Sequence, residues 1–200
     1  EVKSGASILL KRVEDYWGKE LPVNKGQDNF DAIEYIFFLD ANVQLEAFKG
    51  DQYDYRLESS AKNWATGYDF PAVRDGRCIK EEITLKQVEG MQSFAFNTRR
   101  GKFQDARVRQ AFNYAFDFEW SNANLFYGQY KRSRSFFNNS TMEATGLPSP
   151  EELALLEPLR SQLPAEVFTA EYSNPVNTSG ADRRKNLRQA SKLLGEAGWN

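Results

Sequence analysis

The side chains that could perform chemistry in this chain of 200 residues are mainly carboxylates and aromatic rings. Asp and Glu together number 28, and there are 15 Phe, 9 Tyr and 4 Trp, but only one Cys and no His. The absence of His removes the commonest general base and metal ligand. The sequence also lacks a Gly-x-Ser-x-Gly elbow, a phosphate-binding loop and a His/Cys metal spacing. We therefore predict no catalytic or metal site, with one alternative left open: scattered carboxylates that pair in space for glycoside hydrolysis.

Two aromatic side chains with the spacing of one helical turn lie in the segment 58–70, ESSAKNWATGYDF. A serine can start a helix here and a glycine can stop it, so Trp64 and Tyr68 fall on one side of that helix. Aromatic rings offer contact area to varied groups at little entropic cost. They also pack inward in protein cores. The sequence leaves both interpretations open for Trp64.

The stretch from Met91 to Asp117 is organised as a strand, a polar turn and a helix. Residues 91–96 alternate in polarity, which predicts a strand. A polar turn follows, and Asp105 can then cap a helix, because its carboxylate accepts backbone N–H bonds that lack intrahelical partners. The residues at the spacing of one helical face are Val108, Ala111, Phe112, Ala115 and Phe116. We expect this face, and Phe112 in particular, to be buried in the core.

The end of the strand 91–96 is a candidate binding edge. In open α/β sheets, ligands bind outside the strand ends, where connections turn into helices. The strand delivers Asn97 and Thr98 to such an edge, and an asparagine side chain offers both a hydrogen-bond donor and an acceptor. This position predicts a ligand contact without naming the ligand.

Other alternating or continuously apolar segments complete a predicted sheet. Residues 6–13 and 77–85 alternate, and residues 30–39 are apolar on both faces, as in a central strand covered on two sides. Together with 91–96, and with a short strand that a resemblance to a known family implies at 53–55, these segments give about five strands. Helices between and after them predict an α/β fold with helices on both faces of the sheet.

Helix start and stop signals are found along the rest of the chain. Asp40 can cap a helix that ends at Gly50. Residues 149–152 form a capping box with proline at the first helical position. Pro158 should kink or split the helix that follows. The last helix is predicted over residues 181–197.

The composition gives no sign of a nucleic-acid or membrane partner. Lys and Arg number 26 against 28 acidic residues, so the formal net charge is only −2. No apolar run approaches membrane-spanning length. A single cysteine, Cys78, excludes an internal disulfide, and in its strand-like stretch we expect a small core residue. The 40% hydrophobic content suffices for one domain with a substantial core.

Several motifs together resemble those of family 5 solute-binding proteins, the extracytoplasmic peptide and dipeptide receptors of ABC importers. In that family an apolar strand ending in Asn-Thr is followed by Asp-x-x-Val-Arg-x-Ala and then by Ala-x-Asp. The matching residues here are 97–98, 105–111 and 115–117. Residues 15–18, Asp-Tyr-Trp-Gly, match another family motif in part, and Ala-Gly-Trp at 197–199 resembles the end of a third.

The resemblance implies the substrate-binding component of an ABC transporter, in which two lobes close on a solute. It covers one lobe only, so we expect residues 1–200 to form a single α/β lobe with a mixed sheet, and the partner lobe and any signal peptide to lie outside this sequence. The implied partners are a peptide or peptide-like ligand, the second lobe and a membrane permease. The implied location is periplasmic, or extracytoplasmic with a lipid anchor, and no cofactor is implied.

The resemblance also implies ligand contacts in three segments. These are the segment that holds Trp64, the end of the strand 91–96, and the polar loop KRSRSFFNNSTMEATGLPS after residue 130. In peptide-binding relatives this loop carries an acid for the peptide's amino terminus, and Glu143 is its only carboxylate. The alternative for Glu143 is an exposed surface glutamate. The predicted ligand-binding residues are Trp64, Tyr68, Phe96, Asn97, Thr98, Phe136, Phe137 and Glu143.

Overall fold

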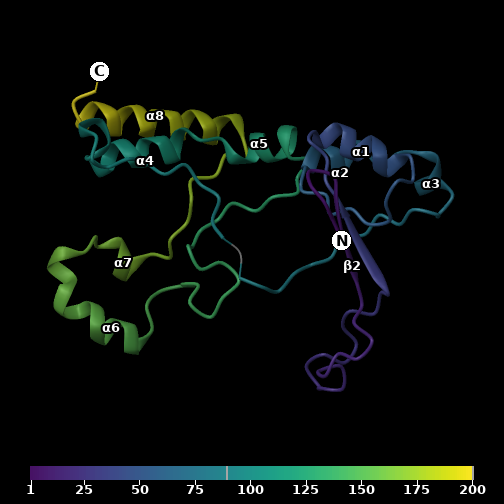
Figure 1. Cartoon of the computed structure of the whole chain (residues 1–200). Helices are drawn as coiled ribbons and strands as arrows, with labels where there is room; N and C mark the ends of the chain where they lie inside the picture. Colours follow the sequence, from purple (N-terminus) through teal and green to yellow (C-terminus); the bar gives the residue numbers. More distant parts are fainter. Residues whose placement is uncertain (89, 200) are drawn as a thin grey trace. The chain divides into compact units, whose positions relative to one another are not determined.

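The computed structural model describes residues 1–88 and 90–199, and these form an α/β protein (Figure 1). The described chain separates into two compact units. The first unit consists of residues 1–59 and 69–79, and the second consists of residues 60–68 and 80 onward. The prediction that residues 1–200 form a single lobe stays a prediction.

The helices, with the two 3-10 helices marked η, are α1 (Ala41–Lys49), α2 (Ala61–Thr66), α3 (Pro71–Arg74), η1 (Gly101–Phe103), α4 (Ala106–Ala115), α5 (Phe118–Leu125), α6 (Pro150–Leu156), η2 (Glu157–Gln162), α7 (Glu166–Thr169) and α8 (Gly180–Glu196). Helices α1, α2, α4 and α6 begin at residues that were predicted to cap them. The carboxylate of Asp40 accepts hydrogen bonds from the backbone of Asn42 and Val43 at the start of α1, at 2.8 and 3.0 Å. The capping box before α6 is complete, and Pro158 lies where α6 gives way to η2, as predicted.

The sheet of the first unit has three antiparallel strands in the order β1 (Val2–Lys3), β2 (Ser7–Lys11) and β3 (Ala32–Ile36). In its register Leu9 of β2 lies opposite Glu34 of β3. Strands β2 and β3 lie inside two segments that the sequence predicted to be strands. The α/β class is therefore confirmed, with a smaller sheet than expected.

Three other segments predicted to be strands are not strands in this structure. Residues 53–55, 77–85 and 91–96 have no strand assignment, and most of their apolar side chains are exposed: Phe94 is 86% exposed and Ile79 is 82% exposed. A strand needs a hydrogen-bonding neighbour along its whole length. Within the described residues these segments have no neighbouring strand. The alternation of polar and apolar residues therefore did not lead to strand pairing.

The core of the first unit combines aromatic rings with a buried ion pair. The ring of Tyr53 lies 5.3 Å from that of Phe48, and its hydroxyl donates a 2.8 Å hydrogen bond to the carbonyl of Gln44 in α1. Arg56 donates to the same hydroxyl at 3.2 Å and to the carboxylate of Glu58 at 3.1 Å. The side chains of this pair are only 6% and 3% exposed. Two opposite charges are thus enclosed beside α1.

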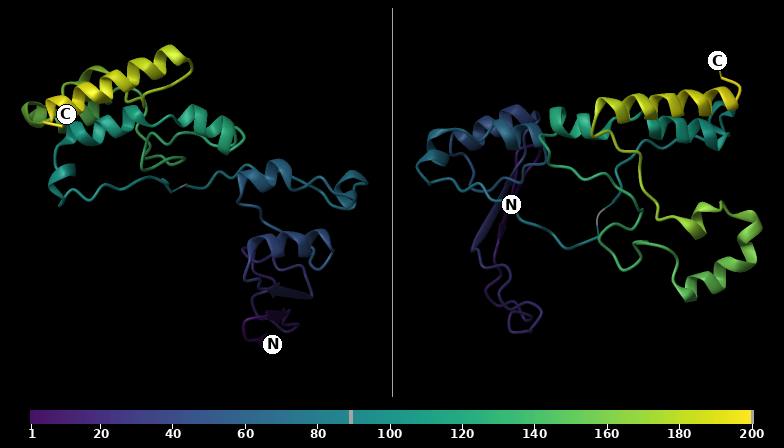
Figure 2. Two further views of the ribbon diagram at one scale, coloured as in Figure 1. Left: turned by 90° about the horizontal axis from the view of Figure 1, so that it is seen from above. Right: turned by 180° about the vertical axis from the view of Figure 1, so that it is seen from behind.

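The core of the second unit lies between two helices. Helix α4 packs along α8, and the teal and yellow helices lie side by side in both views of Figure 2. The buried residues at the contact are Ala111 of α4 with Ala190 and Leu193 of α8, and Ala111 is only 1% exposed. The small side chains of Ala111 and Ala190 let the two backbones approach closely.

The prediction that Phe112 is buried was wrong, because this side chain is 49% exposed. Helix α8 covers the edge of α4 that carries Val108 and Ala111, which are 4% and 1% exposed. Phe112 lies on the neighbouring edge, in an aromatic group with Phe96 and Phe103. Phe116, which was expected on the same face, is also exposed, at 41%.

None of the helices in the described part of the chain is both long enough and apolar enough to span a bilayer.

Candidate functional site

Trp64 and Tyr68 contact each other, although α2 ends at Thr66, before Tyr68. Ser60 caps α2 by accepting a 3.3 Å hydrogen bond from the backbone of Asn63. The two rings follow with centroids 6.0 Å apart and planes inclined at 56°. The ammonium group of Lys80 lies 4.4 Å from the centre of the Trp64 ring and 5.8 Å from that of Tyr68. Tyr68 is buried and Trp64 is partly buried, so a cation–π contact occupies a face of this aromatic pair.

The turn after residue 96 forms without a strand before it. The side-chain oxygen of Asn97 accepts from the backbone N–H of Arg99 at 3.1 Å, and its backbone carbonyl accepts from Arg100 at 3.0 Å. These bonds use the acceptor capacity of Asn97 to shape the turn. Phe96 packs against Phe103, with ring centroids 5.0 Å apart. Thr98 is exposed.

The loop that holds Phe136, Phe137 and Glu143 exposes its aromatic rings and anchors its carboxylate. Phe136 is 77% exposed and Phe137 is 47% exposed. The carboxylate of Glu143 accepts from the guanidinium of Arg134 at 3.3 Å and from the backbone of Asn139 at 3.0 Å. Its charge is therefore already paired, and a ligand ammonium group would compete with Arg134 for it. That the three predicted segments line one surface stays a prediction.

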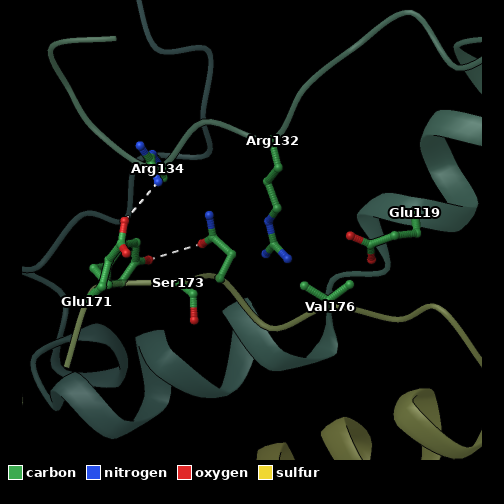
Figure 3. A pocket seen from close by; sticks show the side chains of 8 residues that line it. Glu119, Arg132, Arg134, Glu171, Ser173 and Val176 are labelled. Atoms are coloured by element: carbon green, nitrogen blue, oxygen red, sulfur yellow. Dashed lines mark hydrogen bonds and ion pairs between the residues drawn. The ribbon is translucent and has the colours of Figure 1, made fainter. Parts of the chain in front are cut away.

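A charged recess lies beside this loop, with a volume of about 520 Å³ (Figure 3). Its lining comes from α5, from the loop after residue 130 and from the extended segment that precedes α8. The lining residues are Glu119, Arg132, Arg134, Glu171, Tyr172, Ser173, Asn174 and Val176. Two arginines and two glutamates thus surround one hollow.

The two arginines of the recess are held differently. Arg134 donates to Glu143 and also to Glu171, at 3.1 Å, so two carboxylates neutralise it. Arg132 donates hydrogen bonds to uncharged groups: the carbonyl of Pro175 at 2.5 Å and both the backbone and side-chain oxygens of Asn113 at 3.3 and 2.7 Å. Partial burial lowers the pKa of the Arg132 guanidinium, and the negative charge of Glu119 opposes this shift.

Residues 174–177 are fixed at the recess by hydrogen bonds to three other places in the chain. Asn174 donates to the carbonyl of Ser133 at 2.9 Å. The buried amide of Asn186, in α8, donates to the carbonyl of Val176 at 3.0 Å. Glu119 accepts from the backbone of Asn177 at 2.9 Å. We call residues 174–177 and these bonds the amide latch.

Sequence reasoning missed Arg132, Glu119 and the amide latch. In the polar loop, the sequence predicted functional roles for Phe136, Phe137 and Glu143 alone. One signal was present: Arg132 and Arg134 lie two positions apart, and in extended chain this spacing places two side chains on the same side. The partners from residues 171–177 gave no such signal, because that segment has no periodicity. Among the described residues, no group of three or more His, Cys, Asp and Glu side chains has the arrangement of a metal site.

Comparison with known proteins shows the class to which this chain belongs. Residues 1–200 match the family model described as "Bacterial extracellular solute-binding proteins, family 5 Middle". The match covers the whole chain, so the chain belongs to family 5 of the bacterial extracellular solute-binding proteins. The resemblance inferred from residues 97–117 is thereby confirmed.

Three curated relatives are similar to this chain over almost its whole length. The chain is 50% identical over 200 residues to "Probable peptide-binding protein YejA" of Agrobacterium fabrum, covering 99% of this chain and 33% of the relative. It is 46% identical over 197 residues to "Uncharacterized protein YejA" of Escherichia coli, covering 98% and 33%. It is 38% identical over 207 residues to "Peptidoglycan-binding protein YepA" of Agrobacterium fabrum, covering 100% and 34%. The chain thus spans about a third of the length of these relatives.

Proposed function

We propose that this chain is part of the substrate-binding component of an ABC importer, and that the complete protein binds peptides or peptide-like solutes in a cleft between two lobes. The observation that carries the proposal is the match of all 200 residues to a solute-binding family, together with 50% identity to a relative named a probable peptide-binding protein. The proposed partners are the peptide, the second lobe and a membrane permease. The proposed location is the periplasm or, with a lipid anchor, the outer face of the membrane.

The proposed mechanism is closure of two lobes around the ligand, followed by release to the permease. In the complete protein we expect a mixed sheet of about five strands, with residues 77–85 and 91–96 finding strand partners. Their alternating, exposed apolar side chains support this expectation.

The proposed ligand contacts are the eight residues predicted from the sequence. Some have exposed rings, and others already contact a neighbouring side chain. The exposed rings of Phe136 and Phe137 have free area to offer to ligand side chains. Trp64, Tyr68, Phe96, Asn97, Thr98 and Glu143 complete the proposed set. For Trp64, a ligand would have to share the ring with Lys80 or displace it. For Glu143, a peptide ammonium group would have to replace the bond from Arg134.

We propose binding rather than hydrolysis as the function. Glycoside hydrolysis requires one protonated and one ionised carboxyl group that face each other. At the recess, Glu143 and Glu171 both form ion pairs with Arg134, at 3.3 and 3.1 Å. The two carboxylates therefore bind an arginine of the chain itself and are not arranged as a free acid and base on either side of a substrate.

The test is a thermal-shift measurement on the full-length protein, because a ligand that binds the native state raises its melting temperature. The probes are pools of short unblocked peptides, with free amino acids at the same total concentration as the control. We expect the peptide pools alone to raise the melting temperature, and Phe136→Ala to reduce the rise without lowering the melting temperature of the unliganded protein. Failure of every peptide pool to shift the melting temperature would contradict the proposal.

Peptidoglycan fragments are a second candidate ligand class. The relative that is 38% identical and named a peptidoglycan-binding protein favours them. The same measurement distinguishes the two classes, with purified muropeptides as a further probe. A shift with muropeptides and none with simple peptides would select the second class.

A further inference from the structure

The recess beside the amide latch contains two facing, opposite charges that form no ion pair with each other. Figure 3 shows the carboxylate of Glu119 pointing toward the guanidinium of Arg132 across the hollow. No ion pair within 4.0 Å involves either residue in the part of the chain that the structure describes. Both residues are partly buried. Both residues line the recess of about 520 Å³, whose volume can accept a small group that carries both signs.

Arg132 retains hydrogen-bonding capacity on its guanidinium. An arginine side chain has five N–H donors, and the bonds to Pro175 and to the two oxygens of Asn113 use three of them. Two donors remain without an acceptor among the described residues. These bonds hold the planar guanidinium in one orientation, so a carboxylate that binds there meets a preorganised partner.

Glu119 is similarly half engaged. One of its oxygens accepts from the backbone of Asn177, at 2.9 Å, and this bond fixes the carboxylate in place. The other oxygen has no donor in the described chain. An ammonium group can therefore bind to Glu119 while the amide latch stays intact.

We propose that this recess is a binding site for zwitterionic groups, in which a carboxylate and an ammonium are attached to the same carbon atom or to adjacent ones, as in a free α-amino acid. Arg132 binds the carboxylate, and Glu119 binds the ammonium. Tyr172 and Val176 at the rim provide apolar area for the side chain of the ligand. None of these four residues belongs to the proposed peptide contacts, although Arg134 of the same recess bonds to Glu143, and the proposal does not depend on peptide binding.

The test uses nuclear magnetic resonance of the full-length protein with isotope-labelled arginine. Arg132→Lys identifies the signal of Arg132 by its disappearance. The probes are L-alanine, which carries both charges, and propionate and isopropylamine, which each carry one. We expect L-alanine to shift the Arg132 signal in a saturable manner and to bind at least about tenfold more tightly than propionate, which corresponds to about 1.4 kcal/mol. The signal of Arg160, whose guanidinium already contacts the carboxylate of Glu157 at 2.6 Å, is the internal control and should not move.

A variant separates the zwitterion proposal from simple anion binding. Glu119→Gln keeps an oxygen that can accept from Asn177 but removes the charge. We expect it to lower the affinity for L-alanine about tenfold and to leave propionate binding unchanged or stronger. Equal shifts with L-alanine and propionate would reduce the site to an anion site and overturn the assignment of Glu119. No shift of the Arg132 signal with any probe would overturn the whole proposal.

Discussion

Different kinds of interaction stabilise the interior of each of the two compact units of this chain. The first unit encloses an arginine and a glutamate beside aromatic rings. The second unit joins two helices through small side chains and fixes an irregular segment with amide hydrogen bonds. Enclosed charges are very sensitive to the loss of one partner, whereas small residues between helices are sensitive to added volume. The same kind of substitution should therefore have different effects in the two units.

The largest effect should come from Glu58→Gln in the first unit. This substitution removes the charge of a carboxylate that accepts from Arg56 in a site where the two side chains are 6% and 3% exposed. Removal of one partner of a buried ion pair destabilises a protein by about 3–5 kcal/mol. Chemical denaturation should show this loss in the free energy of unfolding. Glu46→Gln is the control, because its pair with Lys49 is exposed and should contribute less than about 1 kcal/mol; equal losses in the two variants would contradict the prediction.

Added volume should matter most at the contact of α4 with α8. Ala111→Leu places a larger side chain where the exposed fraction is only 1%, and overpacking of this kind costs about 1–3 kcal/mol. Ala115→Leu, on the exposed side of the same helix, should change the stability by less than about 0.5 kcal/mol. The comparison of their denaturation midpoints isolates packing from helix propensity. A neutral Ala111→Leu would mean that the helices do not approach closely at this point.

The amide latch should contribute less than the helix contact. Asn186→Ala removes the buried donor to the carbonyl of Val176 and to the side chain of Asn177, at 3.0 and 2.9 Å. We expect a loss of about 1–2 kcal/mol and faster hydrogen exchange at the backbone amide of Asn177. Asn124→Ala is the control, because its exposed amide donates only to the carbonyl of Trp120 within its own helix. A loss equal to that of Asn124→Ala would show that the latch carries no stability.

The smallest effect concerns the two aspartates that cap α1 and α4. The guanidinium of Arg107, assisted by its backbone N–H, lowers the pKa of Asp105 from 3.8 to about 2. For Asp40 the backbone N–H groups of Val43 and Asn42 lower the pKa. Because the pKa of Asp105 is depressed on folding, its stabilising contribution is complete above pH 3.8 and is lost as the pH falls toward 2. Arg107→Ala should raise the midpoint of Asp105 in a carboxyl NMR titration and leave Asp40 unchanged; an unmoved Asp105 would assign its shift to the backbone alone.

Local signals in the sequence predicted the helix boundaries well. Asp40, Asp105 and Ser149 cap helices because each side chain bonds to a backbone group two or three residues away. Such bonds depend on a few neighbouring residues. The prediction at Pro158 succeeded for the same reason, since its ring conflicts with the preceding turn.

Non-local features could not be read in the same way. The spacing of α4 identified an apolar side but not the edge that α8 covers, so the burial of Val108 was predicted correctly and that of Phe112 was not. The alternation of residues 91–96 could not supply a neighbouring strand. At the candidate site, the sequence placed Trp64 and Tyr68 on one side of a helix, but α2 ends before Tyr68. The bond of Arg132 to Pro175 gave no signal in the sequence because it joins residues 43 positions apart.

The segment from α6 to α7, which we call the excursion, contains a site at which the second unit can be cut in two. Arg160 is the only lysine or arginine between Arg134 and Arg183, and it lies in an exposed 3-10 helix. Exposed segments of this kind are preferred sites of proteolysis. Trypsin should therefore cut the excursion once, between two halves that still share the α4–α8 contact and the bonds across residues 132 and 175. The nicked chain should stay associated as two complementary fragments, and the same position is a natural place to split the gene into halves that reassemble.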